Sequence, residues 1–322
     1  MLKVVTTRKL PDAVEARLAE LFDVELHADE TPMARADLIA AMQDCDVLVP
    51  TLGDHIGADE LAEAGANLKL IANYGSGFDH IDVAAARAKG VLVTNTPGAN
   101  ADDTADMTLA LILATMRRFK EGSAVMQSGD WVGWSPSAFL GQGLSGKSLG
   151  IIGLGRVGRA VASRARAFGM EIHYHNRNRL HADTEAMFDA TFWPDLDVML
   201  PEMDVISLNC PATADNYHMI NADRIALMRS QAVIINTSRG ELLDEVALAD
   251  ALDAGHLSGA GLDVFEKDPD TETRLHNMPN VMMLPHMGSA TVSARNAMGD
   301  HVIRNIKVFE DGHTPPSVIL AE

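Results

Sequence analysis

The chain is poor in positive charge, in aromatic side chains and in cysteine. Its 322 residues include 26 Lys and Arg against 45 Asp and Glu, which gives a formal net charge of −19, and only 5% are aromatic. A surface this acidic repels phosphate backbones and anionic lipids, so we expect no nucleic-acid or membrane partner. The two cysteines, Cys45 and Cys210, supply neither a disulfide framework nor a C-x-x-C pair.

Three further signals are missing. No apolar run is long enough to cross a bilayer, and residues 1–6 read as a strand rather than as a signal peptide. No H-x-x-x-H or H-E-x-x-H pair occurs, so we expect no metal site. Together these absences favour a cytoplasmic protein without metal.

What is present points to two α/β domains. A chain of 322 residues exceeds what one core usually serves. The first hundred residues alternate short apolar strands with helices, which predicts a small unit with a parallel sheet. From Asp102 to about Lys120 runs a helical pattern that is apolar on nearly every side. Such a helix is buried between domains, against a second subunit, or in an ordinary core.

A glycine fingerprint lies near the middle of the chain. The apolar strand 148–152 is followed by Gly153-Leu-Gly155-Arg-Val-Gly158, a helix to Phe168 and a second strand over 170–175. Gly153 allows a tight turn, Gly155 lets a pyrophosphate approach the backbone, and Gly158 lets helix and strand pack closely. The flanking elements favour a dinucleotide site over a tight turn in an unrelated α/β protein.

The end of the second strand indicates which dinucleotide is used. An acid here would bind the ribose 2′-hydroxyl and repel a 2′-phosphate. The chain has Asn176, Arg177, Asn178 and Arg179 instead. We therefore expect that NADP(H) is preferred, with Asn176 on the ribose and Arg177 or Arg179 on the phosphate. The alternative is that these are ordinary surface arginines and that NAD(H) is used.

Polar residues follow several later strands, at the sheet edge where ligands bind in open α/β folds. Arg239 closes an apolar strand beside Gly240 and is suited to hold a carboxylate. His286 lies between Pro285 and Gly288, and its imidazole suits proton transfer near neutral pH. The loop over 263–268 supplies the acids Asp263, Glu266 and Asp268.

An arginine, an acid and a histidine together suit the reduction of a 2-keto acid. The guanidinium anchors the substrate carboxylate and polarises its carbonyl, and the imidazolium protonates the developing alkoxide. A carboxylate behind the imidazole fixes its tautomer and stabilises its charge. The alternative is that Arg239 pairs with a surface acid and that the acids of the loop 263–268 are simply exposed to solvent.

With these residues identified, the chain resembles the D-isomer-specific 2-hydroxyacid dehydrogenases nearly from end to end. The markers are 72–79, Asn95-Thr-Pro-Gly98, 153–158, Asn209-Cys-Pro211, 236–240, 261–264 and 285–288. The resemblance implies two Rossmann-like α/β domains. A discontinuous, flavodoxin-like substrate domain would comprise 1–100 plus 287–322, and an inserted nucleotide-binding domain would comprise 101–286. It also implies a homodimer joined through the helix after residue 100.

The resemblance assigns catalysis to Arg239 and His286. It places the substrate carboxylate on backbone N–H groups near Tyr74, Gly75, Ser76 and Gly77. The family's catalytic acid is usually a Glu, but Asp268 stands at that position here and is one methylene shorter. Contact with the histidine would then need a shifted backbone or a bridging water, and Glu266 is the alternative acid.

The resemblance also gives the remaining contacts. Beyond the glycines and the residues after the second strand, those expected to contact the cofactor are Thr104, Arg156, Val157, Cys210, Pro211, Thr237, Ser238, Asp263 and Gly288. Leu52 is expected to line the substrate. Within the family, the segment around Trp131 and Trp134 is similar to glyoxylate/hydroxypyruvate reductases. Trp134 would reach a neighbouring subunit's site and favour short keto acids, unless it is merely a packing residue.

Three alternatives remain at this point. A 3-phosphoglycerate dehydrogenase would need extra phosphate-binding cations and often has a further C-terminal domain. We do not expect such a domain here, because the sequence stops at Glu322. A formate dehydrogenase would have Gln where an acid stands here. A dinucleotide-sensing module akin to corepressors of this fold would not need catalysis, although such modules can keep the three residues.

Overall fold

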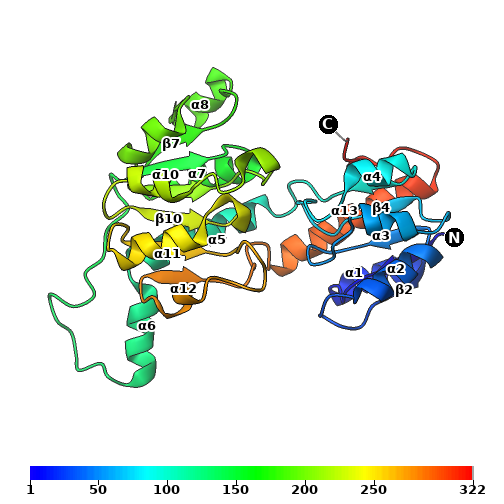
Figure 1. The fold of residues 1–322 in the computed structure, drawn as a ribbon, viewed down its shortest axis with the longest axis horizontal. Helices are drawn as coiled ribbons and strands as arrows, with labels where there is room; N and C mark the ends of the chain where they lie inside the picture. The colour runs from blue at the N-terminus through cyan, green and yellow to red at the C-terminus, as the bar shows by residue number, and fades with distance from the viewer. Residues whose placement is uncertain (321–322) are drawn as a thin grey trace. The chain divides into compact units, whose positions relative to one another are not determined.

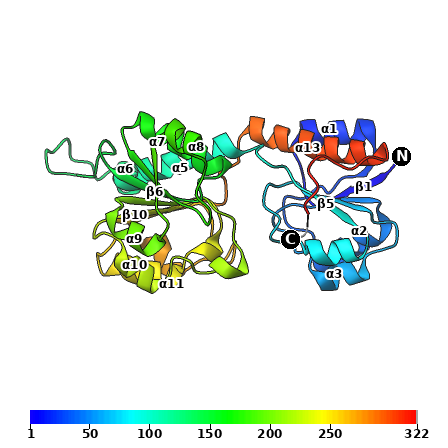
Figure 2. The same ribbon diagram turned by 90° about the horizontal axis from the view of Figure 1, so that it is seen from above.

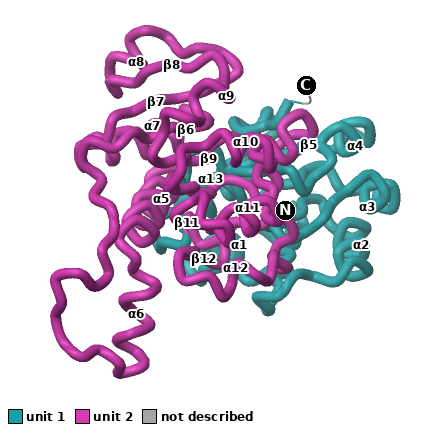
Figure 3. The backbone as a smooth tube through the Cα atoms, turned by 60° about the vertical axis from the view of Figure 1, so that its left-hand side comes forward, with its two compact units in different colours: residues 1–100, 290–322 teal, residues 101–289 magenta. Residues whose placement is uncertain are grey.

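The computed structural model describes residues 1–320, which divide into two compact units. Unit 1 is Met1–Asn100 together with the segment from Ala290 on, and unit 2 is Ala101–Ser289 (Figure 3). The division falls after Ser289, where the sequence placed it after residue 286. Each unit is a layered α/β fold around its own parallel sheet.

Unit 1 has a five-stranded sheet in the order β2-β1-β3-β4-β5. Every pairing is parallel, and the order is that of flavodoxin-like folds. The strands are short, and all except β2 are mainly apolar: β1 Lys3–Thr6, β2 Asp23–Glu25, β3 Val47–Val49, β4 Leu70–Ala72 and β5 Leu92–Thr94. The helices are α1 Asp12–Leu21, α2 Arg35–Asp44, α3 Ala58–Glu63, α4 Val83–Ala88 and α13 Val292–Glu310.

Alternation along these strands builds two cores in unit 1. Val47 and Val49 pack with Leu18 of α1 and Val302 of α13, whereas Leu48 faces the core beneath α2 and α3. Figure 2 shows α1 and α13 on one face of this sheet and α2 and α3 on the other. The C-terminal helix therefore belongs to the same unit as the N-terminus.

Unit 2 has a seven-stranded sheet in the order β12-β11-β10-β9-β6-β7-β8, again entirely parallel. The strands are β6 Ser148–Ile152, β7 Glu171–His175, β8 Ala190–Phe192, β9 Val205–Leu208, β10 Val233–Asn236, β11 Gly259–Leu262 and β12 Val281–Met283. The order reverses between β6 and β9, which is the switch point where a Rossmann fold binds its ligand.

Helices cover both faces of this second sheet (Figures 1 and 2). One core packs α5 Ala101–Met116 and α7 Arg156–Ala167 against the sheet. The other packs α9 Leu196–Met199, α10 Ala222–Leu227, α11 Glu245–Asp253 and α12 Thr273–Asn277. The remaining helices are α6 Phe119–Ser128 and α8 Ala182–Phe188. The fold expected from the sequence, two Rossmann-like α/β domains, is confirmed.

The long apolar helix differs from its prediction. It ends at Met116, and Arg118, with φ of +56°, is the N-cap of the separate helix α6, which begins at Phe119. The buried side of α5 packs on α7 and on strands β10 and β11 of its own unit. Its apolar character is thus largely explained within unit 2. Among the helices described, none has the length and apolarity that would be needed to span a membrane.

Candidate active site

The glycine fingerprint forms the turn from β6 into α7. Gly153 has φ of +100°, and a Cβ on it would lie 2.7 Å from the backbone nitrogen of Cys210. A Cβ on Gly158 would overlap the carbonyl oxygen of Gly153. By contrast, a Cβ on Gly155 would meet no atom within 4 Å. Two glycines are therefore required by packing, and the third leaves open space.

That open space lies at the N-terminus of α7. Gly155 is the N-cap and supplies no side-chain hydrogen bond, so the first N–H groups of the helix lack a capping side chain. Arg156 and Val157, both predicted contacts, form the first turn, and Arg156 is exposed. A bare helix N-terminus beneath a glycine loop binds anionic phosphate through N–H groups and the helix dipole. These residues therefore fit a dinucleotide.

Two hydrogen bonds join the end of β7 to the glycine loop. Asn176 accepts a hydrogen bond from the N–H of Leu154 through its Oδ1, at 2.8 Å. The N–H of Gly153 donates to the carbonyl of His175 at 3.0 Å. Asn176 is thus placed beside the glycine loop as predicted, but its amide oxygen is engaged in holding that loop.

The two candidate arginines differ sharply. Arg179 donates to Glu185 through Nε at 2.9 Å and through a terminal nitrogen at 2.8 Å, and its guanidinium lies 5.6 Å from the ring centre of Phe192. Glu185 also accepts from Tyr174, and these two donors lower the pKa of its carboxyl to about 2. Arg177 is exposed and makes no hydrogen bond or ion pair within residues 1–320. Only Arg177 is available for a phosphate in this arrangement.

The next loops along the sheet carry four of the other predicted contacts. Cys210 and Pro211 follow β9, and Thr237 and Ser238 follow β10. Ser238 donates its hydroxyl to the carbonyl of Cys210, which ties the two loops together. Burial raises the pKa of the Cys210 thiol to about 11, with Arg177 acting weakly in the opposite direction. The thiol is therefore neutral and unreactive near pH 7.

Thr237 is held from the helix side. Its hydroxyl lies 2.8 Å from that of Thr108 on α5, and Thr108 donates in turn to the carbonyl of Thr104. A Cβ on Gly288 would lie 3.5 Å from Thr104 and 2.9 Å from a carboxylate oxygen of Asp263. Thr104, Thr237, Asp263 and Gly288 are therefore linked by contacts around the start of α5.

Asp263 anchors the segment that carries the histidine. Its carboxylate is almost fully buried and accepts from the N–H of Met287 at 2.8 Å and from that of Gly288 at 2.7 Å. Burial raises the pKa of this carboxyl. His286 itself has φ of +52°, an unfavourable conformation for a residue with a Cβ. The two hydrogen bonds to Asp263 help to hold the chain in that conformation.

Asp268 contacts His286 directly. Its Oδ2 lies 2.9 Å from the histidine Nδ1, and its Oδ1 accepts from the N–H of Phe265 at 3.2 Å. The side chain of His286 is 34% exposed and that of Asp268 is 40% exposed. An imidazole held by a carboxylate on Nδ1 keeps Nε2 for proton donation.

Glu266, the alternative acid, is turned elsewhere. It accepts from the hydroxyl of Tyr217 at 2.5 Å and lies 3.2 Å from Nε2 of His218. The hydrogen bond from Tyr217, with support from His218, lowers the pKa of this carboxyl. In this arrangement Glu266 serves the Tyr217–His218 pair and not His286.

Arg239 lies at the turn after β10. One of its terminal nitrogens donates to the carbonyl of Ser238 at 2.7 Å, and its own carbonyl accepts from Asn236 at 2.8 Å. Gly240 follows, and a Cβ there would overlap the backbone of Phe265. Glycine is thus required for the arginine turn to pack against the loop that carries Asp268.

Unit 1 contains the predicted carboxylate loop. The carbonyls of Gly75, Ser76 and Gly77 all accept hydrogen bonds, from Asn73, Asn95 and Thr96. The N–H groups of the same three residues find no acceptor within residues 1–320. A run of N–H groups left available in this way suits an anion. The sequence did not single out Asn73, whose only signal is its place next to the Tyr-Gly-Ser-Gly motif.

The neighbours of this loop are also fixed. Tyr74 donates its hydroxyl to the carbonyl of Arg295 at 2.5 Å, and burial raises the pKa of the phenol to about 12. A Cβ on Gly75 would lie 3.1 Å from the side chain of Leu52. Leu52 therefore lies next to the predicted carboxylate loop, whereas the side chain of Tyr74 is turned to the backbone of α13.

Trp134 lies on an arm of unit 2, in a part of the chain well before Asp268 and His286. The arm comprises α6 and the chain up to β6, and it exposes Phe119, Met126, Trp131, Val132, Trp134 and Leu140. Trp134 is 84% exposed, so it is not a packing residue within the chain itself. Figure 1 shows this arm standing away from the sheet of unit 2. Asp268 and His286 are not part of this arm.

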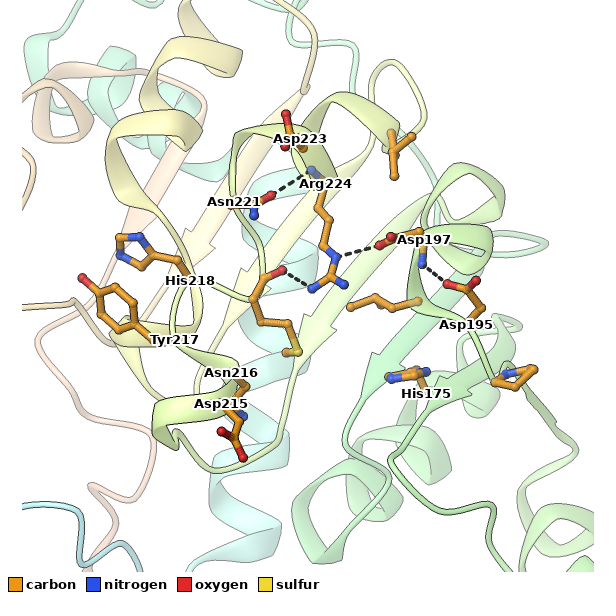
Figure 4. A pocket seen from close by; sticks show the side chains of 14 residues that line it. His175, Asp195, Asp197, Asp215, Asn216, Tyr217, His218, Asn221, Asp223 and Arg224 are labelled. Carbon is orange, nitrogen blue, oxygen red and sulfur yellow. Dashed lines mark hydrogen bonds and ion pairs between the residues drawn. The ribbon is translucent and has the colours of Figure 1, made fainter.

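A cavity of about 720 Å³ lies beside the end of β7 (Figure 4). Its polar lining is largely engaged internally: Arg224 pairs with Asp197 at 2.6 Å, and Asp195 caps α9. It is lined by His175 and His218 but by none of Arg239, Asp268 and His286. The cavity is therefore separate from the catalytic candidates.

Comparison with known proteins agrees with this geometry. The profile of the family described as "D-isomer specific 2-hydroxyacid dehydrogenase, NAD binding domain" matches residues 109–288. A glyoxylate reductase of Thermococcus onnurineus is 42% identical over 99% of this chain and 96% of its own length.

Two solved structures extend the comparison. A glyoxylate reductase from Paecilomyes thermophila has a TM-score of 0.87 at 31% identity and covers 98% of each chain. An NADPH-dependent glyoxylate/hydroxypyruvate reductase from Sinorhizobium meliloti, in complex with NADP and malonate, has a TM-score of 0.86 at 33% identity. That match covers 98% of this chain and 96% of the other.

Proposed function

Because this chain belongs to the D-isomer-specific 2-hydroxyacid dehydrogenases, we propose that it reduces glyoxylate and hydroxypyruvate to the 2-hydroxy acids with NADPH. The enzyme class, an NAD(P)-dependent oxidoreductase, follows from the family. The choice of substrate is supported by the names of the relatives, which favour a reductase over a 3-phosphoglycerate or formate dehydrogenase and over a sensing module.

One observation carries the mechanism. Asp268 and His286 are joined at 2.9 Å, in the same unit as the bare N-terminus of α7. A histidine whose Nδ1 is held by a carboxylate presents a proton on Nε2 and is stabilised when charged. We assign the proton donor of the reduction to this Nε2.

The residues at the glycine loop fit a nicotinamide dinucleotide. Gly153, Gly155 and Gly158 would place its pyrophosphate on the N-terminus of α7, and the loops after β9 and β10 would flank it. When bound, the reduced cofactor supplies a hydride to the carbonyl carbon of the substrate.

The protein's own groups do the rest. N–H groups of Gly75, Ser76 and Gly77 would bind the substrate carboxylate, and Arg239 would hold that carboxylate and polarise the carbonyl. As the carbon receives the hydride, the carbonyl electron pair moves to oxygen. His286 then gives this oxygen its Nε2 proton and is left neutral. One keto group, one hydride and one proton become one hydroxyl-bearing carbon, so the step balances.

The preference for NADPH rests on Arg177. No acid follows β7 to bind a ribose 2′-hydroxyl, and Arg177 is exposed without a partner within residues 1–320. A 2′-phosphate would gain a charge-assisted hydrogen bond there, whereas NADH would gain none. The Sinorhizobium meliloti relative is named as NADPH-dependent, which supports the same choice.

We further propose that the enzyme is a homodimer whose partner covers the arm. The exposed apolar side chains of the arm form a set that soluble proteins usually bury against a partner. Trp134, in the partner's site, would limit the substrate to short keto acids. A location in the cytoplasm, expected from composition, belongs to the same proposal.

Mixing enzyme, NADPH and a panel of keto acids tests the function directly. We expect rapid loss of the nicotinamide absorbance with glyoxylate and hydroxypyruvate and slower loss with bulkier keto acids. Absence of turnover with every member of the panel, despite tight NADPH binding, would favour a sensing module instead.

A further inference from the structure

We propose that Glu245 is a positioning residue that holds the catalytic acid Asp268 in reach of His286. The proposal rests on the proposed function only for its effect on turnover. Glu245 is the first residue of α11 and follows the N-cap Asp244. No sequence motif assigned a role to Glu245.

The carboxylate of Glu245 receives two backbone hydrogen bonds from one loop. Oε1 accepts from the N–H of Glu266 at 2.7 Å, and Oε2 accepts from the N–H of Glu272 at 3.1 Å. Glu245 is 6% exposed, so these bonds replace hydration that the carboxylate has lost. One buried side chain thereby fixes both ends of the segment 266–272.

Asp268 lies inside the segment that is fixed in this way. Its side chain is short, so the 2.9 Å contact with His286 depends on where the backbone of residue 268 lies. The N–H of Phe265 supports the other oxygen of Asp268 from just before the segment. Moving either end of the segment would lengthen the contact between the acid and the histidine.

A second set of contacts ties the same loop to the arginine turn. Gly240, next to Arg239, packs so closely on the backbone of Phe265 that no Cβ fits between them. Gly240 and Glu245 both lie between β10 and the first turn of α11. The stretch of chain that begins at the Arg239 turn therefore also sets the position of the loop that carries Asp268.

Tyr217 and His218 hold the loop from its other side, through the side chain of Glu266. Their contacts leave the N–H of Glu266 to Glu245. The side chain of Glu266 is thus bound by Tyr217 and His218, and its backbone N–H by Glu245. The segment 266–272 is held at both of its ends, and Asp268 lies between them.

The test is a double-mutant cycle of Glu245→Gln with Asp268→Asn. Glutamine keeps the size of the side chain but turns one acceptor oxygen into an NH₂ group that opposes a backbone N–H. Glu245→Asp keeps the charge but is too short to reach both N–H groups, and it serves if the glutamine variant folds poorly. Glu241→Gln is the matched control, because the Glu241 carboxylate makes no hydrogen bond or ion pair within residues 1–320.

We expect Glu245→Gln to lower kcat by about tenfold to a hundredfold, because misplacement of a catalytic group by a fraction of an ångström to 1 Å has effects of this order. The KM for NADPH should change by less than about twofold. In the Asp268→Asn background the same substitution should cost almost nothing further, because the contact that it positions is already lost. Glu241→Gln should behave as the wild type.

Hydrogen exchange supplies a readout that needs no turnover. Amides of 266–272 should exchange faster in Glu245→Gln than in the wild type or in Glu241→Gln. Unchanged exchange, an unchanged kcat in an active enzyme, or losses that multiply with Asp268→Asn would each overturn the proposal. An inactive wild type would refute the proposed function instead, and the exchange experiment would still decide whether Glu245 holds the loop.

Discussion

Oδ2 of Asp268 lies 2.9 Å from Nδ1 of His286, so the short aspartate side chain reaches the histidine directly. The shorter side chain was expected to need a shifted backbone or a bridging water. The contact is direct, and the loop that carries Asp268 is held by backbone hydrogen bonds at both ends. The backbone of this loop therefore places the aspartate side chain within direct reach of the histidine.

Replacing Asp268 with Asn should lower kcat by about tenfold or more and change the KM for NADPH by less than about twofold. The amide does not hold Nδ1 of His286 as the carboxylate does, so Nε2 is less well placed to donate its proton. Turnover of the two enzymes with NADPH and glyoxylate measures the loss. Glu266→Gln should keep the turnover of the wild type, and a loss there rather than in Asp268→Asn would transfer the acid role to Glu266.

Replacing Arg177 with Ala should raise the KM for NADPH by about tenfold or more and leave that for NADH almost unchanged. Loss of a hydrogen bond to a charged phosphate accounts for an effect of that order. Arg179→Ala is the control, since Arg179 is already bound to Glu185. Equal effects of Arg177→Ala on the two cofactors would rule out the phosphate contact.

Glu185 should stabilise the fold only above acidic pH. Its pKa is lowered from 4.5 to about 2 by hydrogen bonds from Arg179 and Tyr174, so the unfolded chain takes up the proton first. The stabilisation is complete above about pH 4.5 and is lost as the pH falls toward about 2. The difference in urea midpoint between the wild type and Glu185→Gln should shrink over this window.

Glu171→Gln provides the comparison for that experiment, because Glu171 is exposed on β7, the strand that carries Tyr174, and its carboxylate makes no hydrogen bond or ion pair within residues 1–320. Its difference from the wild type should stay small at every pH. A constant difference for Glu185→Gln down to pH 2 would show that the ion pair does not contribute as described.

Replacing Trp134 with Ala should change substrate choice without weakening NADPH binding. If the indole of one copy limits the site of another, its removal should raise kcat/KM for bulky keto acids relative to glyoxylate. Kinetics over a panel of keto acids, with the molar mass in solution measured in parallel, checks both parts. A monomeric wild type would contradict the assigned role of Trp134.

Sequence patterns predicted the sheet strands well where these are fully buried. The apolar strand predicted at 148–152 is β6, which is buried throughout, and the glycine fingerprint formed the turn into α7 as expected. Strand β8 was missed because Ala190–Phe192 is a short edge strand with little apolar pattern. The break at Arg118 was also missed, because apolar periodicity continues across a residue of positive φ.

The site was predictable in its residue types and less so in its contacts. His286 and Arg239 stand out by their place after apolar strands. Sequence alone could not separate Arg177 from Arg179, because the decisive partner, Glu185, lies in the following helix. Nor could it find Glu245, whose two hydrogen bonds go to backbone groups that no side-chain pattern reveals.

The central claim is that His286 supplies the proton when a short keto acid is reduced. NADPH oxidation with glyoxylate, measured for the wild type and for His286→Ala alongside NADPH binding, tests it most directly. We predict that kcat falls by about 10² to 10⁴-fold, the usual contribution of a general acid, while the Kd for NADPH changes by less than about twofold. Turnover that survives the substitution would contradict the account.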